Sequence, residues 1–190
     1  MRIVLASASP RRRELLQMLG LEGFLICPAQ GEEKPPVHAS PEETVCSLAS
    51  AKAREVAAKF IPETMVIAAD TIVVADHTVL GKPHSEEEAF RMLRHLSGRT
   101  HEVYTGVSIM LNGEYETQAE CTRVRFRELT DEEIRHYIAT GEPMDKAGAY
   151  GAQGKAALFV EKIEGDFFNV VGLPLCLLGG MLKRKGVTIL

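Results

Sequence analysis

The chain has 190 residues, which suffices to bury a substantial core and fits one large domain. No apolar stretch approaches the ~20 residues of a membrane span, and arginines follow the first short apolar run, so we expect neither a span nor a secretory signal and place the protein in the cytoplasm. The formal net charge of −4 argues against a generally basic surface for nucleic acid, and the four cysteines contain no Cys-x-x-Cys pair typical of a zinc or redox site.

The first third of the sequence predicts strands that alternate with helices. Gly20 marks the end of the first helix, and Ser40 and Glu43 form a capping box at the start of the second. In chain order we expect a strand over 2–7, a helix over 10–19, a strand near 23–28, an ordered loop over 30–40 and a helix over 41–60.

The remaining two thirds add hairpins to this alternation. In chain order we expect a strand over 65–75, a return strand at 79–80, a helix from Ser85 to 97–98, a hairpin of strands 103–111 and 115–127, a helix after Thr130 and a second hairpin over 156–168. Because hairpins and crossover helices both occur, the predicted fold class is α/β with a mixed, twisted β-sheet flanked by helices. We expect residues 1–190 to form a single domain, with two lobes around a cleft as the alternative arrangement.

Three arginines, Arg11 to Arg13, stand in the first turn of the first predicted helix. A helix N-terminus carries unpaired N–H donors and about half a positive charge, so cations are unfavourable there unless an anion is bound. Together with the hydroxyl groups of Ser7 and Ser9, these arginines indicate a phosphate site at the end of a strand. Ser9, which precedes Pro10, is also well explained as a helix cap.

Asp70 interrupts the apolar strand predicted over 65–75. Strand alternation places its carboxylate on the same face as Ile72 and Val74, where an uncompensated charge costs several kcal/mol. We therefore expect a metal ion, a basic side chain or several hydrogen bonds beside it. A structural ion pair is the alternative to a functional site, and we favour the functional site.

Two lysines stand where they could neutralise phosphate. Lys52 falls on the apolar stripe of the helix over 41–60, which directs its amine toward the core or a cleft. Taken alone, that position is better explained by an aliphatic stem that covers apolar surface while the charge reaches water. Lys82 precedes Pro83 in a loop, where a solvated lysine is an equally good interpretation.

The acidic pair Glu32-Glu33 and Asp70 offer hard oxygen ligands for a divalent cation, Mg²⁺ or Mn²⁺. The nearby basic side chains suit phosphate oxygens. This combination indicates hydrolysis at phosphorus, in which a carboxylate orients or deprotonates water and cations stabilise the transition state.

A glycine-rich loop covers residues 145–155. It is not a P-loop, because five residues separate Gly148 from Gly154 and Ala156 replaces the required hydroxyl. The loop could bring backbone donors and the Gln153 amide to a ligand, or it could be an ordinary flexible turn, and composition does not choose between the two.

Seven segments in order give the chain a close resemblance to the Maf-like nucleotide pyrophosphatases over nearly its whole length. They are Ser7-Ala8-Ser9-Pro10-Arg11-Arg12, Glu32-Glu33, Leu48-Ala49-Ser50-Ala51-Lys52-Ala53, Ala69-Asp70-Thr71, Gly81-Lys82-Pro83, Leu96-Ser97-Gly98-Arg99-Thr100-His101 and Gly172-Leu173-Pro174. The resemblance implies cleavage of a nucleoside triphosphate between its α and β phosphates, with a divalent metal cation. It also implies a fold similar to that of inosine triphosphatases, with an active-site cleft, and a possible homodimer.

The resemblance also implies roles for individual residues. Asp70 matches the catalytic proton acceptor, and Glu33 and Asp70 match the metal site. Glu32 departs from the aspartate found in part of the family, which leaves the identity of the metal-binding acid open. The positions that match phosphate ligands are Ser7, Arg12, Arg13, Lys52 and Lys82.

The segment 142–154 is similar to that of the pyrimidine branch of the family, which implies dTTP and UTP as main substrates. Arg12, Thr71 and Gln153 match the positions linked to substrate choice. An amide such as that of Gln153 can donate to one carbonyl of thymine or uracil and accept from the ring N–H, a pairing geometry that cytosine or a purine would not satisfy equally.

Other functions remain as alternatives. Hydrolysis of 7-methyl-GTP, of modified pyrimidine nucleotides or of a broad range of nucleotides would use the same residues with a different base site. A nucleotide-binding regulator of cell division would bind without turnover, but a binder of polyanions gains nothing from the carboxylate of Asp70. Nucleic-acid binding through Arg11 to Arg13 conflicts with the acidic remainder of the chain.

Overall fold

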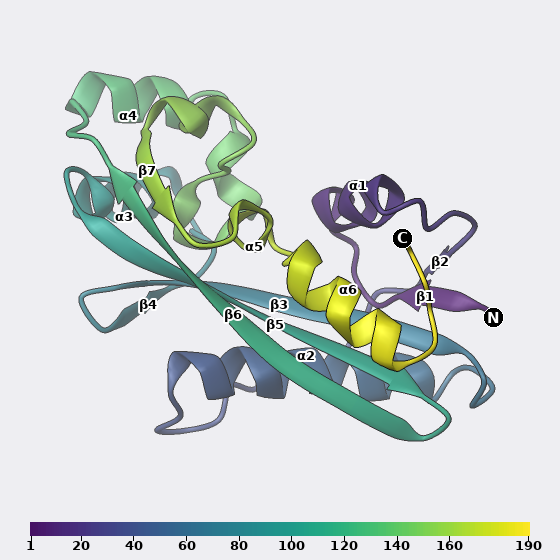
Figure 1. Cartoon of the computed structure of the whole chain (residues 1–190). Helices are drawn as coiled ribbons and strands as arrows, with labels where there is room; N and C mark the ends of the chain where they lie inside the picture. Colours follow the sequence, from purple (N-terminus) through teal and green to yellow (C-terminus); the bar gives the residue numbers. More distant parts are fainter. The chain divides into compact units, whose positions relative to one another are not determined.

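The computed structural model describes all of residues 1–190. Figure 1 shows a sheet whose long strands β3, β5 and β6 are accompanied by helices. The elements are, in chain order, β1 (Ile3–Leu5), α1 (Pro10–Met18), β2 (Leu25–Ile26), α2 (Pro41–Ala57), β3 (Met65–Ala75), β4 (Thr78–Leu80), α3 (Glu86–Leu96), β5 (Thr100–Leu111), β6 (Glu114–Phe126), α4 (Asp131–Ile138), the 3-10 turns η1 (Glu142–Asp145), η2 (Ala147–Ala149) and η3 (Lys155–Leu158), β7 (Val160–Glu164), α5 (Phe167–Val171) and α6 (Leu175–Arg184).

The sheet is mixed, as predicted. Its order is β2-β1-β3-β5-β6-β7, and β4 pairs with β3. β1 runs parallel to both β2 and β3, whereas β4 is antiparallel to β3 and β7 is antiparallel to β6. Asn112 and Gly113 both adopt a positive φ between β5 and β6, the conformation of the tight hairpin turn expected there.

The chain divides into two compact units. The first comprises Met1–Asp70, Thr105–Glu120 and Gly172–Leu190, and the second comprises Thr71–Tyr104 and Cys121–Val171. Asp70 and Thr71 are consecutive in β3, so this strand changes units at the residue singled out by the sequence. Each unit has its own buried apolar cluster.

In the first unit, α2 packs its buried side directly against β5. A Cβ at Gly106 of β5 would lie 2.5 Å from the carbonyl carbon of Val45 and 2.8 Å from the amide nitrogen of Cys46, so the strand and helix backbones are in contact. The predicted capping box is present, because Ser40 accepts from the amide of Glu43 and Glu43 accepts from the amide of Ser40. Helix α2 is therefore fixed both at its start and against the sheet.

The second unit is built around aromatic side chains. Phe126 is fully buried, and the ring of Tyr150 meets it edge-on with centroids 4.8 Å apart. His101, also buried, lies edge-on to both rings, and its Nε2 is 2.8 Å from the Tyr150 hydroxyl. Its Nδ1 is buried without a hydrogen-bond partner, so this core contains one imidazole that is suited only to the neutral form.

The last third of the chain departs from the prediction. The hairpin expected over 156–168 is wrong: Ala156 lies in η3, and only Val160–Glu164 forms a strand, paired with β6. Gly165 has φ +125° and packs against Thr122, and the carboxylate of Asp166 then accepts from the amide of Phe168 at 2.7 Å, which starts α5. The turn and the helix cap replace the second strand.

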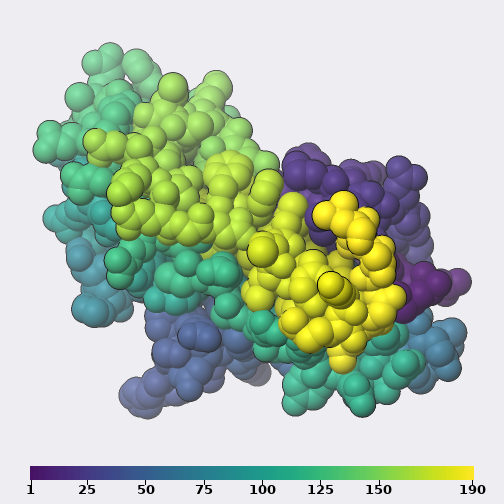
Figure 2. Space-filling model, in the orientation of Figure 1, coloured from purple at the N-terminus to yellow at the C-terminus, as the bar shows by residue number.

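The C-terminal apolar segment forms α6, a helix that the sequence analysis did not identify. Leu178, Met181 and Leu182 are fully buried on one side of α6. Figure 2 shows the other side of this segment, in yellow, at the surface. Residues 173–178 and all of α6 belong to the first unit. No helix of the chain combines the length and the apolarity needed to cross a membrane.

We expect Gly106→Ala to destabilise the protein by about 1–3 kcal/mol, because the new methyl group would overlap the backbone of α2. Urea unfolding followed by circular dichroism measures the change. Gly179→Ala is the matched control: a Cβ there meets nothing within 4 Å and lies inside α6, so it should stabilise by about 0.5–1 kcal/mol. Equal stability of Gly106→Ala and the parent would contradict the contact.

We expect acid to weaken the protein through His101. Burial lowers the pKa of His101 to about 4, whereas an unfolded histidine titrates near 6.5, so the unfolded chain binds the extra proton as the pH falls through 6.5 toward 4. Between pH 7.5 and pH 5 this linkage should remove about 2 kcal/mol. His101→Phe should lose that part of the pH dependence in urea unfolding, and exposed His136→Gln should retain it.

Candidate functional site

The turn between β1 and α1 gathers hydroxyl and guanidinium groups, as the sequence predicted. Ser9 caps α1 by accepting from the amide of Arg12, and its own amide donates to the buried Ser7 hydroxyl at 3.2 Å. A guanidinium nitrogen of Arg12 donates to the same Ser7 oxygen at 3.2 Å. Arg13 is exposed on the first turn. No acidic residue occupies this turn, so the helix end retains the polarity that suits an anion.

The side chain of Arg12 also ties this turn to two other segments. It donates at 2.8 Å to the carbonyl oxygen of Ala69, next to Asp70, and at 2.8 Å to that of Gly172, which precedes α6. Burial lowers the pKa of Arg12 from its ordinary value, and the negative charge of Asp70 opposes that shift. The sequence suggested that Arg12 is a phosphate ligand. In the structure its side chain also joins the β1–α1 turn to the segments of Ala69 and Gly172.

Asp70 and Lys52 form an ion pair within the first unit. Asp70 is only 7% exposed, and its Oδ1 lies 2.6 Å from Nζ of Lys52, which α2 supplies. The partner that a carboxylate in an apolar strand requires is therefore a lysine of the neighbouring helix. The side chain of Lys52 is 18% exposed and ends on carboxylates, so the interpretation of Lys52 as a stem whose charge reaches water is wrong.

Glu33 completes this cluster from the loop before α2. Its Oε1 lies 2.6 Å from the same Nζ of Lys52, and its side chain is 59% exposed. Glu32 instead pairs with Lys34 at 3.1 Å, with both side chains exposed. Of the two acids in the predicted pair, Glu33 is the one brought next to Asp70.

The sequence analysis missed the residue that holds this loop. The carboxylate of Glu55 accepts from the amides of Gln30 and Gly31 at 2.8 and 2.9 Å, and these bonds lower the pKa of Glu55 to about 2. Glu55 follows Lys52 by three residues and so lies on the same side of α2. An acidic residue in a charged helix gives no sequence signal for such a contact.

The cluster suits a divalent cation that also binds phosphate. Oε1 of Glu33 and Oδ1 of Asp70 each lie 2.6 Å from Nζ of Lys52, so both carboxylates face one position, which a divalent cation would have to share with that ammonium or take over. No group of three or more histidine, cysteine or acidic side chains could hold a metal ion by itself. Mg²⁺ sites of this kind use one or two carboxylates and take their remaining oxygens from substrate phosphates and water. The donor set therefore fits that use.

Lys82, Thr71 and Gln153 belong to the second unit. The amide of Gly148 donates to the carbonyl of Gly81 at 3.0 Å, which joins the lysine loop to the glycine-rich loop. Thr71 is half-buried in β3, whereas Gln153 and Lys82 are exposed. These three predicted residues thus lie in one unit. A backbone hydrogen bond joins the loop that holds Lys82 to the loop that holds Gln153.

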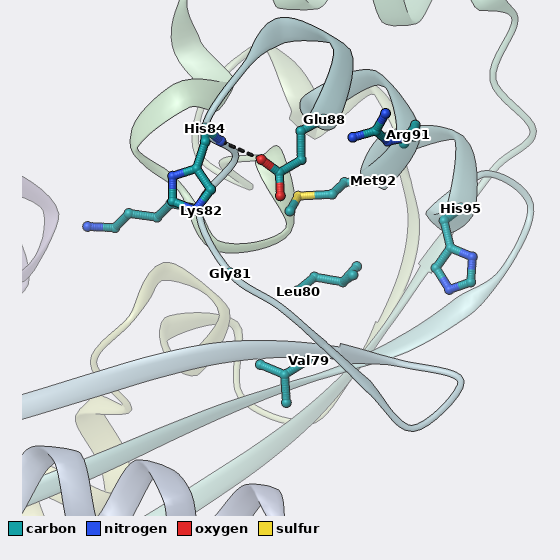
Figure 3. A pocket seen from close by; sticks show the side chains of 9 residues that line it. All are labelled: Val79, Leu80, Gly81, Lys82, His84, Glu88, Arg91, Met92 and His95. Atoms are coloured by element: carbon teal, nitrogen blue, oxygen red, sulfur yellow. Dashed lines mark hydrogen bonds between the residues drawn. The ribbon is translucent and has the colours of Figure 1, made fainter. Parts of the chain in front are cut away.

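A pocket of about 390 Å³ lies beside Lys82. Figure 3 shows the Lys82 side chain extending away from Glu88, Arg91 and His95, which line the same pocket from α3. The Glu88 carboxylate accepts from the amide of His84 at 2.7 Å and fixes the turn after Lys82.

Comparisons with known proteins show the family to which the chain belongs. The model of the family described as Maf-like protein matches residues 2–185. Proteins named dTTP/UTP pyrophosphatase are similar along the whole chain: the one from Geobacillus sp. (strain WCH70) is 53% identical over 97% of this chain and 98% of its own length. The one from Pelotomaculum thermopropionicum is 52% identical over 99% and 98%. The chain therefore belongs to the Maf-like family.

Solved structures confirm the fold class. A HAM1 protein from Coxiella burnetii has a TM-score of 0.55 at 18% identity and covers 97% of this chain and 99% of its own. The Ham1 protein of Staphylococcus aureus has a TM-score of 0.50 at 14% identity, with 97% and 100% covered. At these identities the likeness concerns the architecture alone.

We expect Lys52→Ala to destabilise the protein by about 3 kcal/mol at neutral pH, because Asp70 would be left buried without its cation. Thermal or urea unfolding measures the loss. Lys34→Ala removes an exposed pair with Glu32 and should change the stability by no more than about 0.5 kcal/mol. Similar effects of the two substitutions would rule out a special role for the Lys52 contact.

Proposed function

We propose that this chain hydrolyses dTTP and UTP to the nucleoside monophosphate and pyrophosphate. The observation that carries the proposal is a buried, lysine-paired Asp70 beside Glu33 in a member of the Maf-like family. Relatives about half identical over nearly their full length are named dTTP/UTP pyrophosphatase, which supports the choice of substrate.

Asp70 is the proposed proton acceptor. Its carboxylate takes a proton from water, and the water oxygen bonds to the α-phosphorus as the bond to the bridging oxygen breaks. The electron pair of that bond leaves with pyrophosphate. The ammonium of Lys52, 2.6 Å from Asp70, compensates the carboxylate before the reaction and can neutralise phosphate charge during it.

Binding of the phosphate groups is further assigned to Ser7, Arg12, Arg13 and Lys82. A helix end without acidic residues suits this task, and the hydroxyl of Ser7 is held by two hydrogen bonds. A divalent cation held by Glu33 and Asp70 would offset phosphate charge and polarise the phosphoryl oxygens.

Base choice is assigned to Gln153, with Arg12 and Thr71. The exposed amide of Gln153 can donate to a carbonyl of uracil or thymine and accept from the ring N–H. Cytosine presents an amino group and an unprotonated ring nitrogen instead, so it reverses both roles. A single well-placed amide therefore favours uracil and thymine nucleotides over those of cytosine.

Product analysis tests the proposal. The purified chain is incubated with dTTP, UTP, CTP, ATP and 7-methyl-GTP in Mg²⁺ or Mn²⁺, and we expect monophosphate and pyrophosphate from dTTP and UTP. Asp70→Asn should lower the rate at least about 100-fold while the protein stays folded, because Lys52 keeps its contact with Glu33. Release of inorganic phosphate would overturn the cleavage site, and binding without turnover would favour a regulator.

The metal proposal has a test that does not depend on activity. In Lys52→Ala, Mn²⁺ could occupy the position of the lost ammonium between Glu33 and Asp70, so we expect millimolar Mn²⁺ to raise its melting temperature more than that of the parent. Adding Asp70→Asn to Lys52→Ala should abolish the difference. Equal shifts in all three proteins would contradict a cation at these carboxylates.

A further inference from the structure

The glycine-rich loop is anchored by one carboxylate, that of Glu142. Glu142 is half-buried in η1, just after α4. Its Oε2 accepts from the amide of Lys155 at 3.1 Å, and its Oε1 accepts from the hydroxyl of Tyr137 at 2.9 Å. One side chain thus connects the end of the loop with the buried side of α4.

Tyr137 extends this connection to Gly151, in the middle of the loop. Its hydroxyl oxygen accepts from the amide of Gly151 at 3.2 Å while its proton is donated to Glu142. The ring is buried and meets Phe159 edge-on with centroids 5.1 Å apart. Burial and the neighbouring carboxylate raise the pKa of Tyr137 well above its usual value, so the hydroxyl stays a neutral donor.

The glycines of the loop are explained by this close approach. A Cβ at Gly154 would lie 2.5 Å from Cδ of Glu142, and a Cβ at Gly151 would lie 2.6 Å from Cε of Lys146. Lys146 in turn donates to the backbone carbonyl of Glu142 at 2.6 Å. The carboxylate and the lysine therefore lie directly against the loop backbone, so a larger residue at either glycine would displace one of these two side chains.

Only Ala152, Gln153 and Gly154 lie between the two anchored amides of Gly151 and Lys155. Gln153 is exposed at the middle of this short span, and the amide of Gly154 donates to the carbonyl of Gly151 at 3.0 Å. With both ends fixed, the backbone direction at Gln153 follows from the contacts of Glu142.

We propose that Glu142, acting through Tyr137 and the amide of Lys155, is a positioning residue for base selection by Gln153. This inference rests on the proposed function, because it assigns a purpose to the orientation of the Gln153 amide. An amide selects uracil over cytosine only if its oxygen and nitrogen face fixed positions, and a mobile loop would let it turn to suit either base. Glu142 supplies that fixation without contacting the base.

The test is a double-substitution cycle read as the ratio of kcat/KM for UTP to that for CTP. Gln153→Ala and Glu142→Ala should each lower this ratio about tenfold, the worth of one neutral hydrogen bond, and the double variant should match Gln153→Ala alone. The change should lie in KM for UTP, with kcat within about threefold of the parent. Glu142→Gln, which keeps one acceptor oxygen, should recover part of the preference.

Controls separate the outcomes. Glu132→Ala removes an exposed acid of α4 and should leave the ratio unchanged. Gly154→Ala, which displaces the Glu142 carboxylate without removing it, should lower the ratio as Glu142→Ala does, and it replaces that variant in the test if Glu142→Ala does not fold.

An unchanged ratio in both Glu142→Ala and Gly154→Ala would overturn the proposal, as would a uniform loss of kcat for all nucleotides or an additive double variant. Each of these results would leave the proposed function standing. If the parent itself does not hydrolyse UTP in preference to CTP, the proposed function fails first, and the two failures are thereby distinguished.

Discussion

The first unit depends on one ammonium group that faces two carboxylates. Lys52 compensates the charge of Asp70 inside an apolar strand and holds Glu33 beside it. Without this contact the carboxylate would be buried with no compensating charge, at a cost of several kcal/mol. The same interaction holds the carboxylate that we propose as the proton acceptor, and α2 must lie at a fixed distance from the sheet to provide it.

The sequence predicted those features best that depend only on neighbouring residues in the chain. Ser40, Ser85 and Thr130 cap helices as predicted, because a cap needs only the next three residues. Asp70 was identifiable because a carboxylate in an apolar strand demands compensation. The partners of Lys52 and the roles of Glu55 and Glu142 could not be predicted, since each depends on a backbone amide or an acid that tertiary packing brings close.

Different kinds of interaction hold the predicted site residues around Asp70 and those around Gln153. Around Asp70 the support is charge, an ion-pair cluster joined to the strand-to-helix turn through Arg12. Around Gln153 it is hydrogen bonding of neutral amides, which fixes direction rather than charge. In the proposed function, the chemistry common to all triphosphates rests on the charged cluster and the choice of base on the segment around Gln153, and Arg12 alone is assigned to both.

The absent side chain at Gly106 has a consequence for the site as well as for packing. Val45, whose backbone touches this glycine, precedes Lys52 by seven residues, which is two turns or ~10 Å along the same side of α2. A helix is stiff over that length, so any residue that lifted Val45 from the strand would lift the lysine with it and lengthen its reach to Asp70. The missing side chain at position 106 therefore helps to set the distance between Lys52 and Asp70.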